Sequence, residues 1–362
     1  MSRRFRLSIP GKTFLVGEYL ALVGGPSIVL NTSPCFEFEW ELEKATDEGM
    51  RGIHHPFHIN SPAGQWLARL SDSLGADIPS VTIHFVDPHN GKGGLGSSSA
   101  EFFGAWVFSK WFQHNVLKES DGASDKNLWQ PAERLFSGLG DYRETIVPNW
   151  SQDISGEQRF RDLIADYRQV VPAASGADLV SQAVGGIALW DGASEEMRRY
   201  QWPFTDLSMT LLLTGKKLAT HTHVSENLKA TLEKETEFVE DMRVWVEEAI
   251  QAFALADSDR LVASVRGVAR ALEQAGRVAE HTASYLDELA SVEGVKAAKG
   301  CGAMGADVIA ILHDPAAIEN VCAFAQENGL VRSGPSRGQE RDLWPVSVRI
   351  EECGDEYKGA EA

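Results

Sequence analysis

Residues 91 to 100 form a glycine- and serine-rich segment, Gly-Lys-Gly-Gly-Leu-Gly-Ser-Ser-Ser-Ala, which runs directly into an apolar, aromatic stretch at 101 to 108. Glycines allow the backbone to turn tightly and to approach a ligand closely. The first amides of a helix have no intrahelical acceptor, and together with the positive end of the helix dipole they bind anions. The segment therefore predicts a phosphate-binding loop, but by itself it also fits a flexible linker that precedes a helix.

The segment differs from two common glycine-rich nucleotide loops. A Walker A loop has a lysine and a serine or threonine directly after its last glycine. In this chain Lys92 precedes the last glycine, and Ser97 follows Gly96 directly. The dinucleotide-binding pattern Gly-x-Gly-x-x-Gly requires a glycine where this chain has Ser99. A phosphate site here requires a different nucleotide-binding solution.

The composition limits the kind of protein. The chain has 362 residues, 43% of them hydrophobic and 24% charged, as in a globular protein of about two domains. Its 34 basic and 52 acidic residues give a net charge of −18, which argues against binding to nucleic acid or to a membrane surface. The sequence shows no signal-peptide pattern, no membrane-length apolar run and no metal-ligand spacing among its four cysteines. We expect a cytoplasmic monomer or homodimer that binds a small molecule.

The elements that must position the glycine-rich segment are predicted from apolar periodicity. Strands are expected at 5–9, 36–42, 81–85, 185–190, 207–213, 308–312 and 344–350. Helices are expected at 101–115, 224–255, 257–274 and 316–327, with a loop at 118–128 and a glycine-rich turn at 299–305. The helix at 101–115 is apolar nearly all round, which predicts deep burial. Strands and helices do not alternate regularly, and this favours an α+β fold.

Two further glycine-centred segments accompany the central one, at 10–19 and at 299–307. In this order and at these separations, the three segments resemble the motifs of the GHMP kinases, which are named for galacto-, homoserine, mevalonate and phosphomevalonate kinases. The resemblance spans residues 10 to 312. It implies an α+β fold of two domains: an N-terminal ATP-binding domain at 1–200 with a left-handed βαβ unit, and a ferredoxin-like C-terminal domain at 201–362.

The resemblance also implies how ATP and Mg²⁺ would bind. ATP would lie between the two domains, and the hydroxyl of Ser98 would lie near the magnesium ion. Neutral amide donors suit a charged ligand, and magnesium bridges phosphate oxygens. The implied cofactor-binding residues are Gly93, Gly94, Leu95, Gly96, Ser97, Ser98 and Ser99.

A fourth segment, Ser175-Gly-Ala-Asp178, resembles the Ser-Gly-x-Asp segment of mevalonate and phosphomevalonate kinases. In those enzymes the aspartate lies against the lysine of the first motif, which is Lys12 in this chain. Phosphoryl transfer to a hydroxyl needs an acceptor for its proton and a positive charge against the developing negative charge. The implied catalytic residues are therefore Asp178 and Lys12. Without this context Asp178 would be read as a helix N-cap, and Lys12 as a solvated surface lysine.

The resemblance extends to the substrate and to the metal. Met304 and Ala306 stand where glycines are common in the family, which predicts a stiffer third loop. Mevalonate kinases carry a magnesium-binding glutamate about eight residues before the serine of Ser-Gly-x-Asp, and this position is Tyr167 here. Either Asp166 takes its place, or the metal relies on Ser98 and phosphate oxygens. The implied substrate-binding residues are Glu18, Tyr19, Ser175, Gly176, Gly302, Ala303 and Gly305.

The sequence favours phosphomevalonate as the substrate. Glu18-Tyr19 resembles the Gly-Glu-Tyr of phosphomevalonate kinases more than the Gly-Glu-His of mevalonate kinases, and Trp202-Pro203 also resembles the former. Lys216 and Lys217 are candidates for holding the extra phosphate, although an exposed lysine pair is typical of a solvated surface. His221 and His223 lack a third metal ligand at suitable spacing and are interpreted as loop histidines.

Two alternatives stay open at this point. The first is a mevalonate kinase, because most of the motif residues fit either enzyme. The second belongs to another class: a non-catalytic regulator that uses the GHMP fold to bind a ligand. The presence of Lys12, Asp178 and Ser98 argues against the regulator, since such proteins tend to lose catalytic residues.

Overall fold

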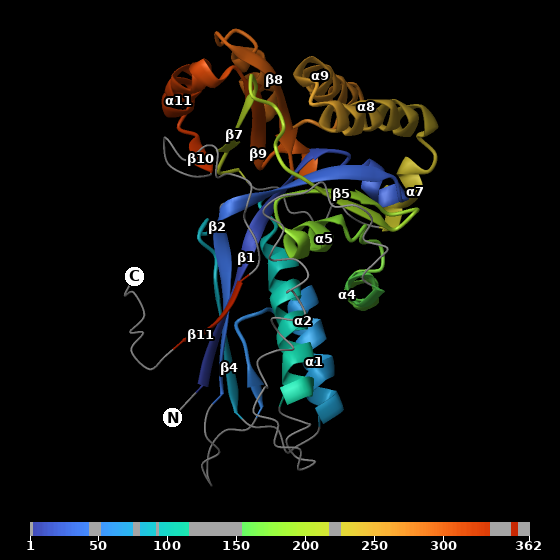
Figure 1. The fold of residues 1–362 in the computed structure, drawn as a ribbon, viewed down its shortest axis with the longest axis vertical. Helices are drawn as coiled ribbons and strands as arrows, with labels where there is room; N and C mark the ends of the chain where they lie inside the picture. The colour runs from blue at the N-terminus through green and yellow to red at the C-terminus, as the bar shows by residue number, and fades with distance from the viewer. Residues whose placement is uncertain are drawn as a thin grey trace.

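The computed structural model describes residues 3–42, 52–74, 80–91, 94–115, 154–216, 226–333 and 349–353. The molecule is elongated, with one β-sheet along the lower part of its long axis and a second sheet above it (Figure 1). Helices lie beside both sheets, and strands and helices follow one another in no regular order. The expected α+β class is confirmed.

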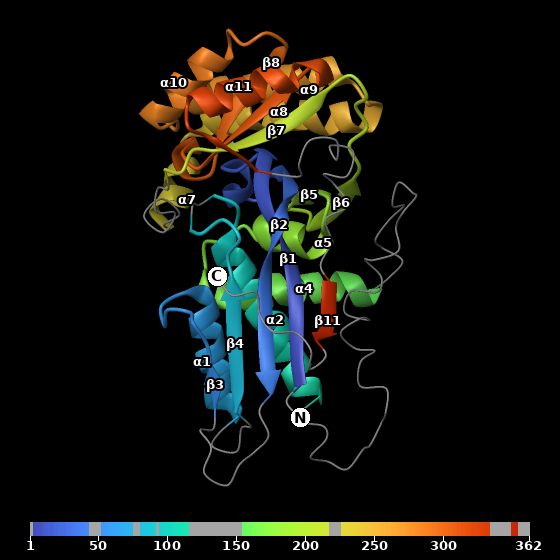
Figure 2. The same ribbon diagram turned by 90° about the vertical axis from the view of Figure 1, so that its left-hand side faces the viewer.

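The first sheet is built on two long antiparallel strands, β1 (Arg3–Val16) and β2 (Pro26–Leu42). One half of β2 also pairs with β4 (Val81–Val86), and the other half pairs with β5 (Ile187–Asp191). The edges are formed by β3 (Ile53–His54), β6 (Glu196–Tyr200) and β11 (Arg349–Cys353). Figure 2 shows β4, β2, β1 and β11 side by side. Strand β11 therefore belongs to the first sheet, although it comes from the end of the chain.

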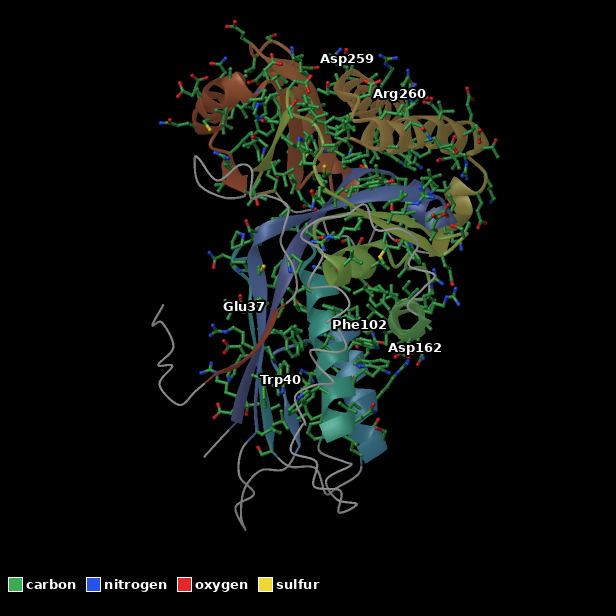
Figure 3. The ribbon with its side chains drawn as sticks, viewed as in Figure 1. Glu37, Trp40, Phe102, Asp162, Asp259 and Arg260 are labelled. Atoms are coloured by element: carbon green, nitrogen blue, oxygen red, sulfur yellow. The ribbon has the colours of Figure 1, made fainter. Side chains whose placement is uncertain are left out.

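Alternation along β2 gives the first sheet one apolar face. Phe38 and Trp40 are fully buried, whereas Glu37 lies on the opposite face (Figure 3). The apolar face packs against α2 (Ser97–Asn115), whose Phe102 lies in the same core, and α2 packs in turn against α1 (Pro62–Leu74). Two further helices, α4 (Ile154–Val170) and α5 (Ala177–Val184), lie beside α2. Because α2 is covered on several sides, its apolar composition all round is explained and its predicted burial is confirmed.

The second sheet consists of β7 (Ser208–Leu213), β8 (Val295–Cys301), β9 (Val308–His313) and β10 (Val331–Ser333). It is antiparallel in the order β10-β7-β9-β8. The helices of this part are α7 (Glu226–Leu232), α8 (Thr236–Leu255), α9 (Ser258–Gln274), α10 (Glu280–Leu289) and α11 (Ile318–Glu327). Leu212 and Ile309 point to one face of the sheet and pack with α10 and α11, whereas Leu211 and Val308 point to the other face and pack with α8 and α9.

A shared apolar core joins the two sheets. Leu15 of β1 and Ile28 of β2 belong to the same buried cluster as Met242 and Val246 of α8 and Val265 of α9. All five side chains are fully buried. Removal of apolar surface from water therefore stabilises the contact between the two parts of the molecule, at about 25 cal/mol for each Å² buried.

Most of the expected elements are present, and three boundaries differ. The helix expected at 101–115 begins at Ser97, so the three serines form its first turn. The helix expected at 224–255 is divided into α7 and α8 by a turn at 233–235. Lys299 and Cys301 belong to β8 and not to a turn, since they pair with β9. The expected loop at 118–128 and most of the strand expected at 344–350 lie outside the described residues.

The contact between α2 and β2 yields a prediction for stability. A Cβ atom at Gly104 of α2 would overlap the aromatic ring of Phe38. We expect Gly104→Ala to lower the free energy of unfolding by about 1–3 kcal/mol, because overpacking outweighs the better helix propensity of alanine. Urea unfolding measures this, and Gln113→Ala on an exposed site of the same helix should change it by less than about 0.5 kcal/mol. Equal or greater stability of Gly104→Ala would contradict the packing argument.

Candidate active site

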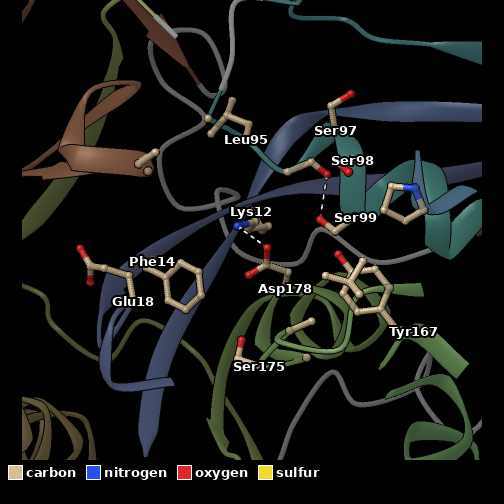
Figure 4. Close-up of a pocket in the computed structure, with 18 of the residues that line it drawn as sticks. Lys12, Phe14, Glu18, Leu95, Ser97, Ser98, Ser99, Tyr167, Ser175 and Asp178 are labelled. Carbon is tan, nitrogen blue, oxygen red and sulfur yellow. Dashed lines mark hydrogen bonds and ion pairs between the residues drawn. The ribbon is translucent and has the colours of Figure 1, made fainter. Parts of the chain in front are cut away.

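A cavity of about 770 Å³ lies where the motif segments meet. Its wall contains residues of all three glycine-centred segments and of the Ser175–Asp178 segment, which come from both parts of the fold (Figure 4). A volume of this size suits a small-molecule ligand. The predicted residues in its wall are Lys12, Glu18, Tyr19, Gly94, Leu95, Gly96, Ser97, Ser98, Ser99, Ser175, Gly176, Asp178, Gly302 and Ala303.

The central glycine loop is held in a conformation that requires glycine. Gly96 has φ +85, and a Cβ atom there would lie 2.7 Å from Cγ of Lys12. The amide of Lys12 donates to the carbonyl of Leu95 at 2.9 Å, which fixes the loop against β1. The side chain of Leu95 lies in the core shared by the two sheets, so it anchors the loop and leaves its backbone at the cavity.

The start of α2 presents polar groups to the cavity. The amide of Ala100 donates to the carbonyl of Gly96, so the amides of Ser97, Ser98 and Ser99 have no acceptor within the helix. The hydroxyl of Ser99 donates to the same carbonyl at 2.9 Å, and all three serines line the cavity. The arrangement has the donors and the dipole direction of an anion-binding site. Gly93 lies outside the described residues.

Lys12 and Asp178 meet at the cavity wall. The ammonium of Lys12, on β1, lies 2.8 Å from the carboxylate of Asp178, on the first turn of α5 (Figure 4). Gly176, in a left-handed conformation, is the N-cap of α5, so Asp178 does not cap this helix. Lys12 is mostly buried, with 12% of its side chain exposed, and is therefore not a solvated surface lysine. The structure thus brings an acceptor and a positive charge together, as expected from the sequence.

Tyr167 occupies the position where mevalonate kinases carry a glutamate, and it lines the cavity. Burial, and then the charge of Asp178, raises the pKa of its hydroxyl, which therefore stays protonated at neutral pH. Asp166 is directed elsewhere: its carboxylate accepts from the indole of Trp106 at 2.9 Å and from the ammonium of Lys110 at 3.0 Å. Asp166 is therefore not available as a magnesium ligand in this structure.

Glu18 and Tyr19 line the cavity and are held from behind by residues of the second part of the fold. Lys299 of β8 is fully buried, and its ammonium lies 2.7 Å from the carboxylate of Glu18. Burial disfavours the ammonium, but the neighbouring Cys301 and Glu18 raise the pKa of Lys299 overall. Burial also raises the pKa of Tyr19. Lys299 is not among the site residues predicted from the sequence.

The third glycine segment closes the cavity on one side. Gly302 and Ala303 line it, whereas Gly305 is buried behind the wall, where its carbonyl accepts from Thr282. A Cβ atom at Gly302 would overlap the carboxylate of Asp307, which explains the glycine there. Met304 has φ +54 within the turn, an uncommon conformation for a residue with a side chain.

Of the two lysines predicted for a substrate phosphate, the one that the structure describes does not line the cavity, whereas two residues that were not predicted do line it. Lys216 is exposed and lies over the ring of Tyr285, outside the cavity wall. Lys217, His221 and His223 lie outside the described residues. His89 and Asp87 line the cavity, although no sequence motif pointed to them. Burial lowers the pKa of His89, so its imidazole is neutral at pH 7.

The described parts of the chain contain no group of three or more histidine, cysteine, aspartate or glutamate side chains that could hold a metal ion. The side chains that line the cavity include the oxygen donors Ser98, Asp178 and Asp87, and oxygen donors are the ligands that magnesium prefers. Within the same residues, no helix has both the length and the apolar character to cross a membrane.

No family model matches this sequence, and no curated protein is similar to it in sequence. Solved structures do match the fold. A Lin0012 protein from Listeria innocua has a TM-score of 0.65 at 15% identity, over 96% of this chain and 99% of that one. The Streptococcus pneumoniae phosphomevalonate kinase in complex with phosphomevalonate and AMPPNP has a TM-score of 0.61 at 15% identity, over 90% of this chain and 97% of that one. The L. major mevalonate kinase in complex with R-mevalonate has a TM-score of 0.59 at 15% identity, over 91% of this chain and 95% of that one.

The structures that match also include a galactokinase and a homoserine kinase, at TM-scores of 0.59 and 0.55. The chain has the GHMP kinase fold. The fold inferred from three short glycine segments is thereby confirmed. Because the GHMP kinase fold is common to kinases named for different small molecules, the fold alone does not select a substrate.

The glycine loop of this GHMP kinase fold yields a second prediction. Gly96 and Gly91 both have positive φ, +85 and +71, but only at Gly96 would an added Cβ atom have neighbours within 4 Å. Replacement by alanine should cost backbone strain at both sites, whereas Gly96→Ala must also displace Lys12. We expect Gly96→Ala to lower the free energy of unfolding by about 1–3 kcal/mol more than Gly91→Ala. Equal losses in urea unfolding would show that contact with Lys12 does not constrain the loop.

Proposed function

We propose that this protein is an ATP-dependent kinase that transfers the γ-phosphoryl group of MgATP to a hydroxyl of a small molecule, with phosphomevalonate as the first candidate. The observation that carries the proposal is the Lys12–Asp178 pair, 2.8 Å apart, in the same cavity wall as the glycine loop and the start of α2. An anion cradle alone would serve a binding protein. A paired acceptor and cation beside it is what phosphoryl transfer to a hydroxyl requires.

The residues present fit MgATP. The amides at the start of α2 and the glycine loop would hold the phosphates, and Ser98 would contribute a hydroxyl to the metal ion. When bound, magnesium neutralises charge on the phosphoryl group. Strong phosphate binding by amides is favoured here because the loop is already fixed by its bond to Lys12 and by the buried Leu95.

The catalytic steps assigned to the chain are few. Asp178 accepts the proton of the substrate hydroxyl on its carboxylate and so increases the nucleophilicity of the oxygen. Lys12 stabilises the carboxylate before the transfer and the phosphoryl oxygens during it, because its ammonium is mostly buried and weakly screened. The bond to Leu95 and the contact with Gly96 keep Lys12 beside both groups.

A specific observation also supports mevalonate as a second candidate. Among the described residues that line the cavity, Lys12 is the one lysine or arginine. Mevalonate carries one carboxylate, whereas phosphomevalonate carries a phosphate in addition and would need more positive charge. The Glu18-Tyr19 sequence, and the similarity to a phosphomevalonate kinase solved with phosphomevalonate and AMPPNP, support the first candidate. The two candidates therefore rest on different features.

Substrate choice is tested with a coupled assay of ADP release. We expect MgATP-dependent turnover with phosphomevalonate or mevalonate, and turnover with homoserine and galactose at least about tenfold lower in kcat/KM, a difference of about 1.4 kcal/mol in transition-state binding. Turnover with neither member of the mevalonate series would contradict both candidates. Binding of ATP without turnover of any alcohol would favour a ligand-binding regulator.

The catalytic pair is tested by Asp178→Asn. Loss of the proton acceptor should lower kcat by about 10²–10⁴-fold while the KM for ATP stays within about threefold, since the phosphate cradle is unchanged. Asp72→Asn, on an exposed site of α1, is the matched control and should retain wild-type kcat. If Asp178→Asn retains full turnover, Asp178 does not have the assigned role.

A further inference from the structure

Lys299 is a fully buried charged residue outside the catalytic pair. It is 0% exposed, within β8, and its ammonium lies 2.7 Å from Oε1 of Glu18 and 3.5 Å from Sγ of Cys301. The thiol of Cys301 donates to the carbonyl of Phe14 on β1. This polar group therefore crosses from the second sheet to the end of β1, inside the contact between the two parts of the molecule.

A contribution to stability does not explain why this pair is charged. Removing two charges from water has a large free-energy cost, and replacing a buried ion pair by apolar residues of similar volume is often neutral or stabilising. The surrounding contact between the sheets is apolar and would accommodate such residues. The charges are better explained by what Glu18 does at the cavity.

The two carboxylate oxygens of Glu18 differ in their hydrogen bonding. Oε1 takes the bond from Lys299, whereas Oε2 is buried without a hydrogen-bond partner among the described residues. Glu18 also belongs to the cavity wall. A buried acceptor without a partner is costly, and a ligand that donates to it removes this cost.

The backbone and the next residue at this turn are also fixed. Gly17 has φ +91, and a Cβ atom there would lie 2.6 Å from the carbonyl oxygen of Pro26. The guanidinium carbon of Arg277 lies 5.0 Å from the ring centroid of Tyr19. The same guanidinium also lies over the ring of Phe238. Both cavity-facing side chains of this turn are thus held by residues from the second part of the fold.

We propose that Lys299 is a positioning residue for substrate recognition: it holds Glu18 at the cavity wall so that Oε2 accepts a hydrogen bond from an O–H or N–H donor of the substrate. This inference rests on the proposed kinase function. Because the ammonium neutralises the carboxylate, the pair suits a neutral donor such as a second hydroxyl and does not suit a divalent cation. The second sheet then contributes to substrate binding through a side chain that does not touch the substrate.

The experiment compares Lys299→Met, Glu18→Gln and the double variant E18Q/K299M with the wild type in the ADP-release assay. In Lys299→Met the carboxylate loses its partner, so the KM for the alcohol should rise by roughly tenfold or more, while the KM for ATP stays within about twofold. Glu18→Gln should raise the same KM. The double variant should not exceed the larger single effect, because the two residues act as one unit.

Stability is separated from positioning by the double variant and by a control on the same strand. Lys299→Met leaves a buried unpaired carboxylate and should lower the melting temperature. E18Q/K299M has no charge at either position, so it should regain the wild-type melting temperature without regaining the low KM. Lys296→Met removes an exposed ammonium from β8, where it pairs with Asp314 at 3.0 Å, and should change neither KM.

The outcomes distinguish this inference from the proposed function. A wild-type protein that phosphorylates no alcohol overturns the kinase function and the inference with it. An active wild type whose KM for the alcohol is unchanged in Lys299→Met overturns the inference alone. So does a double variant that regains both the melting temperature and the low KM, or a Lys299→Met variant in which the KM for ATP rises equally.

Discussion

The geometry of the cavity depends on the 2.9 Å hydrogen bond from the amide of Lys12 to the carbonyl of Leu95. This bond joins the glycine loop to strand β1, and Gly96 packs so closely against the Lys12 side chain that no Cβ atom fits between them. The side chain of the same lysine then reaches Asp178. One residue thus contacts both the glycine loop and Asp178, and in the proposed function such fixed polar groups are effective because they need no reorganisation during a reaction.

The contact between the two sheets serves packing and the site together. Its apolar core includes Leu95 of the glycine loop, so burial that stabilises the fold also anchors the loop. Within the same contact, Lys299 reaches Glu18 and Arg277 covers Tyr19. One part of the cavity wall is therefore held by β1 and α2, and another part is held by the second sheet.

Local patterns are sufficient to predict much of the fold. Alternation predicts the buried Phe38 and Trp40, and the all-round apolar character of α2 predicts its burial. The first turn of α2 escapes prediction because serines have low helix propensity in isolation, whereas here their amides face the cavity and Ser99 bonds back to Gly96. The glycine neighbours of Lys299 are typical of a turn, although pairing with β9 makes this residue part of a strand.

The sequence alone specifies the glycines, serines and charged residues whose backbone freedom and chemistry permit a phosphate site and a proton acceptor. It can do so because positive φ and helix-start amides are local properties. Which charged groups meet depends instead on the tertiary fold. Glu18 and Lys299 are 281 residues apart, and Asp166 turns to Trp106 and Lys110, away from the cavity. Burial and pairing of charges depend on what packs around them, and residues distant in the chain supply that packing.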